Sequence, residues 1–535
     1  MENEIVKSLC DKFGVSMPNV PIWQIFRHLG AFWHHFGIHT RKCDRTGRTI
    51  ISVFDETCPY PVWHKDEWVK HAEPPEAAYD PERPFFEQLF ELFKQCPIPH
   101  NIGSNNENCE YTDDLWYSRN CYLCHSGVKN EDAHYCYRVL TLKDSEFCVF
   151  SFTSELCTDL INSTDCFNVN FALNSRQCRD SAFLFDCRNI TDSLFCWNLR
   201  NKKYCIFNKQ YTEEEYKKER AKYDFGSRKI YDEGKQTFYE ILNTKVNFKN
   251  VDLEQCENCT GDYLQKCKNC FNCYMMTEAE DCAHSFRAGW IKDNLLTMSS
   301  YNAELVYMSS MAQDKCYDIR FCWNLMTCKY MEYSANCLNC EYCFGCSGLV
   351  NMKYCIFNKK YSSEEWKTKV AEIKTDLIAR NQYGEFFPAY FAASPYDESI
   401  SGFHWPLTLS EQASLHFRVK QDKSDKHPEY LPVSDIPDNS HDADETICQK
   451  TFWDSIANRP FKITQFDLKF CKARNLPLPN CFYVRRIKEN FSLTFCNGTL
   501  RETVCSKTGE KIMTGLPQSL DGRILSHEAY LDEVV

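Results

Sequence analysis

Glycine, excess basic charge and long apolar runs are all scarce in this sequence of 535 residues. Only 18 residues are glycine, and neither the G-x-G-x-x-G pattern of dinucleotide-binding folds nor a G-x-x-x-x-G-K-[ST] phosphate loop occurs. The net charge of −12 argues against bulk electrostatic binding to nucleic acid or to acidic membranes. No uninterrupted apolar run reaches the roughly 18 residues of a membrane-spanning helix, so we expect no membrane span.

The start of the chain also lacks the features of a secretory signal. Met1–Lys7 (MENEIVK) has no basic segment followed by an apolar core. We therefore expect a reducing compartment, in which thiols stay free or bind metal and do not form disulfides. The expected location is the cytoplasm or, for a viral protein, the virion.

Cysteine and aromatic residues, in contrast, are abundant. The chain has 34 Cys, 38 Phe, 29 Tyr and 11 Trp. A hydrophobic content of 43% argues against disorder. The length is sufficient for about two to four domains that bury cores of their own.

A direct repeat organises the middle of the chain. The segment Asn201–Tyr216 (NKKYCIFNKQYTEEEY) recurs as Asn351–Trp366 (NMKYCIFNKKYSSEEW), at an offset of 150. The same offset pairs five upstream cysteines of the first copy with cysteines of the second, from Cys166 with Cys316 to Cys205 with Cys355, and it pairs 107–109 with 257–259. A one-residue slip aligns 120–124 with 269–273. The chain therefore contains two copies of one cysteine-rich unit.

A second duplication joins the two ends of the chain. Cys10–Val20 aligns with Cys471–Cys481 at an offset of 461, and Cys43–Ile51 aligns with Cys505–Met513 at an offset of 462. We expect these ends to form two related small modules of zinc-ribbon-like α+β structure. The predicted domains are an N-terminal module with a helical connector (1–105), the first unit with a helical cap (106–225), a connector (226–255), the second unit with its cap (256–380), a linker (381–447) and a C-terminal module (448–535).

The cysteines of the first unit recur on a three-residue lattice. From Cys136 to Cys205 the successive gaps are 12, 9, 9, 12, 9, 9 and 9. An amphipathic helix would alternate gaps of three and four, and a β-meander would alternate every two residues, so neither fits. Coils of about 18–21 residues do fit, because small side chains then stack at the corners of a parallel β-helix. The predicted fold class is mainly β with α-helical caps: tandem cysteine-rich parallel β-helix (solenoid) units flanked by the two end modules.

Each unit ends in a predicted helix, at 211–220 and at 361–370. In both segments a Thr or Ser is followed by acidic residues and then by basic ones. This order is typical of a capped helix whose charges match its dipole. We expect each helix to cover the open last coil and so to block edge-to-edge growth.

Three interpretations of the cysteines within the units stay open. The first is packing, because a free cysteine behaves as a small hydrophobic side chain. The second is zinc binding by pairs such as Cys256/Cys259 with Cys267/Cys270, whose separation is shorter than that of a usual zinc ribbon. The third is disulfide or redox chemistry.

The C-terminal module holds the stronger metal candidates. Cys448, Cys481 and Cys505, with Cys496 or Cys471 nearby, could supply the four thiolates of a tetrahedral zinc site. Zinc is therefore the one cofactor that we expect.

The N-terminal module keeps fewer of these ligands. Val20 stands where the other module has Cys481, and only Cys43 of that pair remains, with Cys58 and nearby histidines as substitutes. The alternative for both modules is that they have lost the metal and are held together by aromatic packing.

No signature of a hydrolase, kinase, metalloprotease or phosphate-binding enzyme occurs. We therefore predict a non-enzymatic structural scaffold whose solenoid faces mediate protein–protein assembly or self-association, for example as a minor capsid component of a virion. One alternative is a zinc-binding protein that recognises another protein or, less expectedly, nucleic acid through Arg41–Lys42 or Arg485–Arg486. The other alternative is a thiol redox protein, which predicts one thiol far more reactive than the rest.

Several segments resemble a large uncharacterised cysteine-rich family of candidate-phyla-radiation bacteria, with relatives in giant DNA viruses. They are Lys42–Ser52, Arg83–Leu92, Asn120–Leu123, Ser154–Cys157, Asn201–Asn208, Arg459–Thr464 and Leu476–Pro479, and the resemblance covers most of the chain. Members often carry the label "CaiB/BaiF family", which implies a CoA-transferase, but the composition and repeats of this chain contradict such an α/β fold. Typical members have a C-P-x-C pair in the end modules that looks like a zinc knuckle, and this sequence keeps only Cys481 of it.

Overall fold

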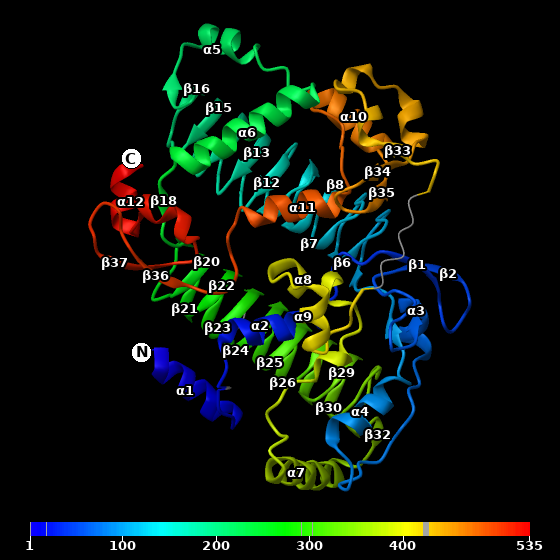
Figure 1. Cartoon of the computed structure of the whole chain (residues 1–535). Coiled ribbons are helices and arrows are strands. Elements are labelled where there is room, and N and C mark those ends of the chain that lie inside the picture. The colour runs from blue at the N-terminus through cyan, green and yellow to red at the C-terminus, as the bar shows by residue number, and fades with distance from the viewer. Residues whose placement is uncertain (1, 18, 290–291, 302, 421–426, 535) are drawn as a thin grey trace.

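The computed structural model describes residues 2–17, 19–289, 292–301, 303–420 and 427–534. Two parallel β-structures dominate these residues, and we call them solenoid 1 and solenoid 2. They lie next to each other in Figure 1, solenoid 1 mainly in cyan and solenoid 2 mainly in green. Within the described residues solenoid 1 (β5 to β17) forms a 13-stranded sheet and solenoid 2 (β19 to β32) a 14-stranded sheet. The predicted mainly β, solenoid class is confirmed.

The strands of both solenoids are between two and ten residues long. Solenoid 1 consists of β5 (Gly103–Ser104), β6 (Asp113–Trp116), β7 (His125–Val128), β8 (Glu131–His134), β9 (Tyr137–Leu140), β10 (Lys143–Glu146), β11 (Val149–Phe152), β12 (Thr158–Ile161), β13 (Phe167–Leu173), β14 (Arg179–Phe185), β15 (Thr191–Trp197), β16 (Lys203–Ile206) and β17 (Lys209–Gln210). Solenoid 2 consists of β19 (Leu253–Glu254), β20 (Gly261–Gln265), β21 (Lys268–Phe271), β22 (Cys273–Thr277), β23 (Glu280–Gly289), β24 (Lys292–Tyr301), β25 (Glu304–Gln313), β26 (Tyr317–Arg320), β27 (Trp323–Met326), β28 (Lys329–Glu332), β29 (Ala335–Leu338), β30 (Glu341–Phe344), β31 (Lys353–Ile356) and β32 (Lys359–Lys360).

One coil of solenoid 1 contains 12 residues, which is the separation of bonded partners such as Asn162 and Asn174. Strand pairs such as His125 with Tyr137 have the same separation. From Asn105 to 207 every third residue has a positive φ of 43–60°, so the chain turns at four corners per coil. The three-residue lattice is confirmed, but the longer coil that we predicted is wrong. A gap of nine between cysteines leads to a different corner of the next coil, whereas the prediction placed stacked cysteines at the same corner.

The left-handed corners explain why so few glycines are needed. Asn and Asp tolerate the left-handed region better than most residues do, because their short polar side chains form local hydrogen bonds. They occupy many corners, and their side chains form ladders along the solenoid. The Asn162 amide donates to Asn174 Oδ1 at 2.8 Å, and the Asn189 amide donates to Asn201 Oδ1 at 2.8 Å.

Cysteine, alanine and aliphatic side chains such as Leu160 fill the narrow interior of each coil. Cys187 of solenoid 1 is typical: its thiol donates to the carbonyls of Phe185 and Cys196, both at 3.5 Å. Its own N–H donates to the hydroxyl of Ser175 at 3.2 Å. All 34 cysteines of the chain are free thiols, and most are buried. Inside the coils cysteine therefore packs and donates weak hydrogen bonds, as the packing interpretation predicts.

Two irregular coils account for the one-residue slip between the copies. In solenoid 2, Glu257 pairs with Lys268 across a coil that is one residue shorter than the others. Glu304 pairs with Tyr317 across a coil that is one residue longer. The shorter coil therefore shifts the alignment with solenoid 1 by one residue, and the longer coil restores it. The extra residue lies at Asp314, where two consecutive residues have positive φ.

A helix follows each solenoid, as predicted. These helices are α5 (Glu213–Arg220) after solenoid 1 and α7 (Ser363–Ala379) after solenoid 2. Thr212 and Ser362 each form a reciprocal capping box with the Glu three residues later. The Trp366 indole donates to the carbonyl of Cys355 at 3.1 Å, so α7 packs on the last coil of solenoid 2.

The helix that precedes each solenoid packs on the other one. Helix α4 (Phe85–Phe93) comes before solenoid 1, but Phe85 contacts Tyr333 of solenoid 2 with ring centroids 5.0 Å apart. Helix α6 (Arg228–Thr244) comes before solenoid 2, but Tyr231 contacts Phe183 of solenoid 1 at 5.5 Å. Phe183 and Tyr333 occupy equivalent positions of the direct repeat. The two halves of the chain therefore hold each other through reciprocal contacts.

The two end modules contain the same elements in the same order. The N-terminal module has α1 (Glu2–Phe13), α2 (Ile22–Gly30), β1 (His39–Lys42), β2 (Thr49–Ser52), β3 (Val62–Trp63) and α3 (Lys65–His71); the C-terminal module has α10 (Gln465–Arg474), α11 (Tyr483–Ser492), β36 (Arg501–Val504), β37 (Lys511–Thr514), β38 (Ile524–Leu525) and α12 (His527–Glu533). Strand β3 pairs with β4 (Ile98–Pro99), just before solenoid 1. Strand β38 pairs with β18 (Phe248–Lys249), just before solenoid 2. The second duplication is therefore structural as well.

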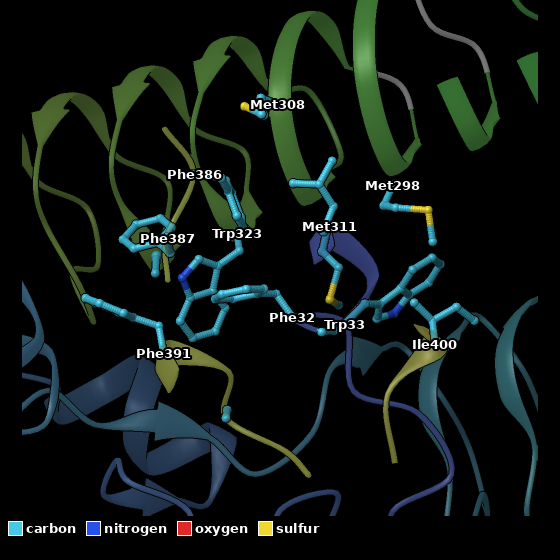
Figure 2. Close-up of a cluster of buried hydrophobic side chains, with 14 of the residues drawn as sticks. Phe32, Trp33, Met298, Met308, Met311, Trp323, Phe386, Phe387, Phe391 and Ile400 are labelled. Carbon is cyan, nitrogen blue, oxygen red and sulfur yellow. The ribbon is translucent and has the colours of Figure 1, made fainter. Parts of the chain in front are cut away.

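The segment between solenoid 2 and the C-terminal module packs closely on the rest of the chain. It contains the short helices α8 (Ile400–His404) and α9 (Leu409–Ser414) and contributes β33 (Leu431–Pro432) to a small sheet with β34 (Phe452–Asp454) and β35 (Arg459–Phe461). Figure 2 shows its Phe387 and Ile400 in an apolar cluster with Phe32 and Trp33 of the N-terminal module and Trp323 of solenoid 2. None of the described helices is long and apolar enough to cross a membrane.

Candidate functional site

A groove with a volume of about 1140 Å³ lies where solenoid 1 meets the two end modules and the segment between them. We call it the central groove. Its walls come from parts of the chain that are far apart in sequence, between residues 36 and 489. The fold therefore creates the groove, and no single segment of the chain contains it.

One wall of the central groove is a single corner column of solenoid 1. Tyr111, Leu123, Tyr135 and Phe147 line the groove, one from each of four successive coils. All four have positive φ, so they occupy the same corner of these coils. The rings of Tyr135 and Phe147 stack with centroids 4.7 Å apart and planes 16° apart. Tyr111 is exposed and Leu123 half-buried, whereas Tyr135 and Phe147 are buried, so the column gives the groove a rigid apolar wall with one open aromatic ring, that of Tyr111.

Glu398 fixes the opposite side of the groove. Its carboxylate makes a hydrogen bond with Nε2 of His39 at 2.7 Å and an ion pair with the ammonium of Lys420 at 2.6 Å. Burial raises the pKa of Glu398, but His39 and Lys420 outweigh this effect, so its pKa lies below the usual value. Glu398 and Lys420 belong to the segment between solenoid 2 and the C-terminal module, and His39 belongs to the N-terminal module. The carboxylate is therefore already paired with two groups, and it joins this segment to the N-terminal module.

Lysines supply positive charge along the third wall. Lys488 of α11 and Lys462 beside β35 line the groove, and neither makes an ion pair within the part of the chain that the structure describes. Crowding by protein lowers the pKa of Lys488, while the charge of Asp397 opposes this shift. Arg485 lies nearby but already pairs with Asp454 at 2.8 Å. The groove thus combines an apolar wall and the exposed ring of Tyr111 with two lysines that can receive an anionic group, and it is also lined by carboxylates, among them Glu56 and Asp397.

The structure does not bring the predicted zinc ligands of the C-terminal module together. Cys448 packs at the edge of one apolar cluster, Cys496 is buried in a second and Cys505 in a third, while Cys481 lines the central groove. Among the described residues no group of three or more His, Cys, Asp or Glu side chains could hold a metal ion. Zinc at these cysteines stays a prediction, and the zinc-ribbon character of the end modules is not seen in their side-chain arrangement.

Cys43 and Cys505 do share one feature of a metal knuckle. Each thiol lies at the base of a tight turn, closed by the N–H of Gly47 to Cys43 O at 2.8 Å and of Gly509 to Cys505 O at 2.9 Å. Burial raises the pKa of Cys505, but hydrogen bonds from Thr508 and from backbone N–H groups outweigh it and lower the pKa to about 6. Within the described residues, the further ligands that a zinc site would need are missing from each turn. Cys58, the other candidate of the N-terminal module, is crowded by protein, which raises its pKa to about 12.

The arginines proposed for nucleic-acid recognition have structural roles. Arg486 is buried and its guanidinium forms a bidentate ion pair with Asp159 of solenoid 1. Arg41 is also buried and donates to the carbonyl of Asp55 at 2.7 Å and to Asp44 at 2.9 Å. These contacts leave both guanidinium groups occupied, which does not favour the nucleic-acid alternative.

The sequence interpretation missed the central groove. A signal for it exists, because Tyr111, Tyr135 and Phe147 fall into one column once the coil length is known. The longer coil that we predicted placed them at different corners and so hid the column. The opposite wall depends on contacts such as that of His39 with Glu398, 359 residues away, for which no local pattern exists. Scans against known protein families and against curated proteins give no match for this chain, so its site rests on its own geometry.

Proposed function

We propose that this chain is a non-enzymatic structural scaffold that assembles with other proteins by taking an extended, acidic and aromatic segment of a partner into the central groove. The observation that carries this proposal is the groove itself: about 1140 Å³ of space between an aromatic column and lysines that have no ion-pair partner among the described residues. Aromatic faces supply contact area at a low cost in entropy, and basic groups select acidic partners.

The bonding of the polar groups around the groove supports binding in preference to catalysis. Glu398 is held by His39 and Lys420, and Arg485 is held by Asp454. A general acid or base must be free to exchange a proton with a substrate, whereas these groups are fixed by one another. The rigid solenoids behind the groove keep its walls in place, which favours a scaffold.

The type of assembly is a further part of the proposal. A particle such as a virion is one assembly in which a rigid scaffold works, and the resemblance to sequences from giant viruses is what suggests it. Zinc, if it binds at the end modules, would then stabilise the modules and would not serve the groove directly. The cytoplasm is the alternative location.

The proposal is tested by selecting random dodecapeptides on phage against the immobilised full chain. We expect enrichment of acidic peptides with aromatic residues, and about a tenfold loss of affinity in the variant Lys462→Glu/Lys488→Glu, since two like charges would then oppose the ligand. The matched control is Lys245→Glu on the exposed end of α6, which should leave affinity unchanged. Selected peptides that share no acidic or aromatic character, or peptides whose affinity is unchanged in the Lys462→Glu/Lys488→Glu variant, would contradict the proposal. Cross-linking in the producing cells that finds no stoichiometric partner and no self-association would also contradict it.

A further inference from the structure

The first coil of solenoid 2 carries two half-exposed cysteines, Cys256 and Cys259. Every other cysteine of this solenoid is buried. The pair lies at the open end of the coil stack, because within the described strands β19 pairs only with β20 and no earlier coil covers it. Both thiols still face the coil interior, where they pack against Cys267 and Cys270 of the next coil.

These four cysteines share one apolar cluster: Cys267 and Cys270 lie within it, and Cys256 and Cys259 pack against it. The thiol of Cys256 donates to the carbonyls of Glu254 and Leu264, both at 3.3 Å. An accessible thiol with a second thiol beside it in the same C-x-x-C segment is the arrangement that thiol–disulfide exchange requires.

Solenoid 1 shows that the fold does not need this pair. Its first coil has Cys109 in the place of Cys259, but Asn106 in the place of Cys256. The Asn106 amide donates to the carbonyl of Leu115 at 2.7 Å, which is equivalent to the contact between Cys256 and Leu264. An asparagine therefore fulfils the structural role at this corner, and the second thiol is a feature of solenoid 2 alone.

We propose that Cys256 and Cys259 form a redox-active dithiol that exchanges with external disulfides of low molecular weight. The Cys256 thiolate attacks one sulfur of the external disulfide, and the other sulfur leaves as a thiolate. The Cys259 thiol then gives its proton to that thiolate and attacks the Cys256 sulfur; the second external sulfur leaves as a thiolate and takes up the proton that Cys256 had lost. The balance is two protein thiols and one external disulfide giving one protein disulfide and two external thiols. This activity is independent of the central groove.

The test uses the full reduced chain and glutathione disulfide in small excess, followed by alkylation of the remaining thiols and peptide mapping. The tryptic peptide 250–266 contains Cys256 and Cys259 and no other cysteine. We expect the two thiols of this peptide to form a disulfide about tenfold faster than the cysteines of any other peptide react, because both are accessible and lie in one C-x-x-C segment. Equal rates at Cys58, Cys109, Cys448 and this pair, or a slower reaction of the pair, would overturn the proposal.

Two variants sharpen the result. Cys256→Asn copies the corner of solenoid 1, so the chain should fold and bind peptides as before while disulfide formation in 250–266 is lost. Cys109→Ser is the matched control at the open end of solenoid 1, and it should leave the rate at 250–266 unchanged. A Cys256→Asn variant in which Cys259 reacts as fast as the original pair would contradict the assignment of Cys256 as the attacking thiol.

Discussion

The two end modules contact the two solenoids at equivalent places but through different chemistry. On solenoid 1 the C-terminal module uses a buried ion pair, in which Arg486 Nε lies 2.9 Å from Asp159 Oδ1. The hydroxyl of Tyr231, which belongs to α6, also donates to Asp159 Oδ2 at 3.0 Å. On solenoid 2 the position equivalent to Arg486 is Ile25, and the position equivalent to Asp159, with the one-residue slip included, is Met308. Both side chains are buried in an apolar cluster. Figure 2 shows Met308 with other apolar side chains of this cluster.

This difference indicates that the docking geometry of the end modules and their choice of solenoid have separate origins. The coil and the helix set the docking geometry on both sides, since it is the same with an ionic and with an apolar contact. A buried ion pair adds little net stability, but losing one partner is costly. We infer that the Arg486–Asp159 pair prevents the C-terminal module from docking on solenoid 2, where Arg486 would meet Met308 instead of a carboxylate.

The largest effect is expected from Asp159→Asn. It leaves the buried guanidinium of Arg486 without its counter-ion, which costs about 3–5 kcal/mol. We expect α11 to lose protection in hydrogen exchange, while α2 on the other solenoid keeps its protection. Asp180→Asn is the control, because Asp180 occupies an exposed corner of the same solenoid. Equal loss of protection in α2 and α11 would show that the two contacts are not independent.

The second prediction uses pH, because only one of the two contacts is ionic. Burial raises the pKa of Asp159, but Arg486 outweighs it and lowers the pKa to about 2 from a usual 3.8. A carboxylate with a depressed pKa stabilises the folded state fully above its unfolded pKa. This contribution, about 2 kcal/mol, is lost as the pH falls from about 4 to about 2.

The measurement compares α11 with α2 over this interval, so that effects common to the chain cancel. Glu146 and Asp467 also face Arg486, and burial raises the pKa of both, of Asp467 to about 6. They are therefore protonated before Asp159 is, and their contribution changes at higher pH. Protection of α11 that stays parallel to that of α2 down to about pH 2 would contradict an ionic contact at Asp159.

Features of this fold that depend on local or periodic sequence patterns could be predicted, and features that depend on other information could not. The three-residue lattice, the duplications and the capping boxes at Thr212 and Ser362 are local or periodic, and the sequence shows them directly. The coil length was predicted wrongly because cysteine gaps of nine and twelve fit more than one coil. The missing information is the left-handed corner, which residues such as Phe171 and Leu156 adopt although propensity does not favour it.

The site was harder to predict than the fold for a related reason. The C-x-x-C pair of Cys256 and Cys259 is visible in the sequence, but its exposure follows from its place in the first coil. The contact of Arg486 with Asp159 spans 327 residues and has no counterpart at Ile25 and Met308, so the internal repeat gave no hint of it.

The smallest effect is expected when the apolar contact is copied onto solenoid 1. The substitutions Asp159→Met, Arg486→Ile and Tyr231→Phe remove the carboxylate together with the cation and the hydroxyl that bind it, so no buried charge of this pair stays uncompensated. Asn490 keeps its bond to the carbonyl of Phe147 at 3.2 Å. Replacing a buried ion pair by apolar side chains of similar size is often neutral or stabilising, so we expect protection of α11 within about 1 kcal/mol of the original chain. A loss as large as that of Asp159→Asn would show that the polar network itself holds the module, and the two contacts would then differ in strength as well as in specificity.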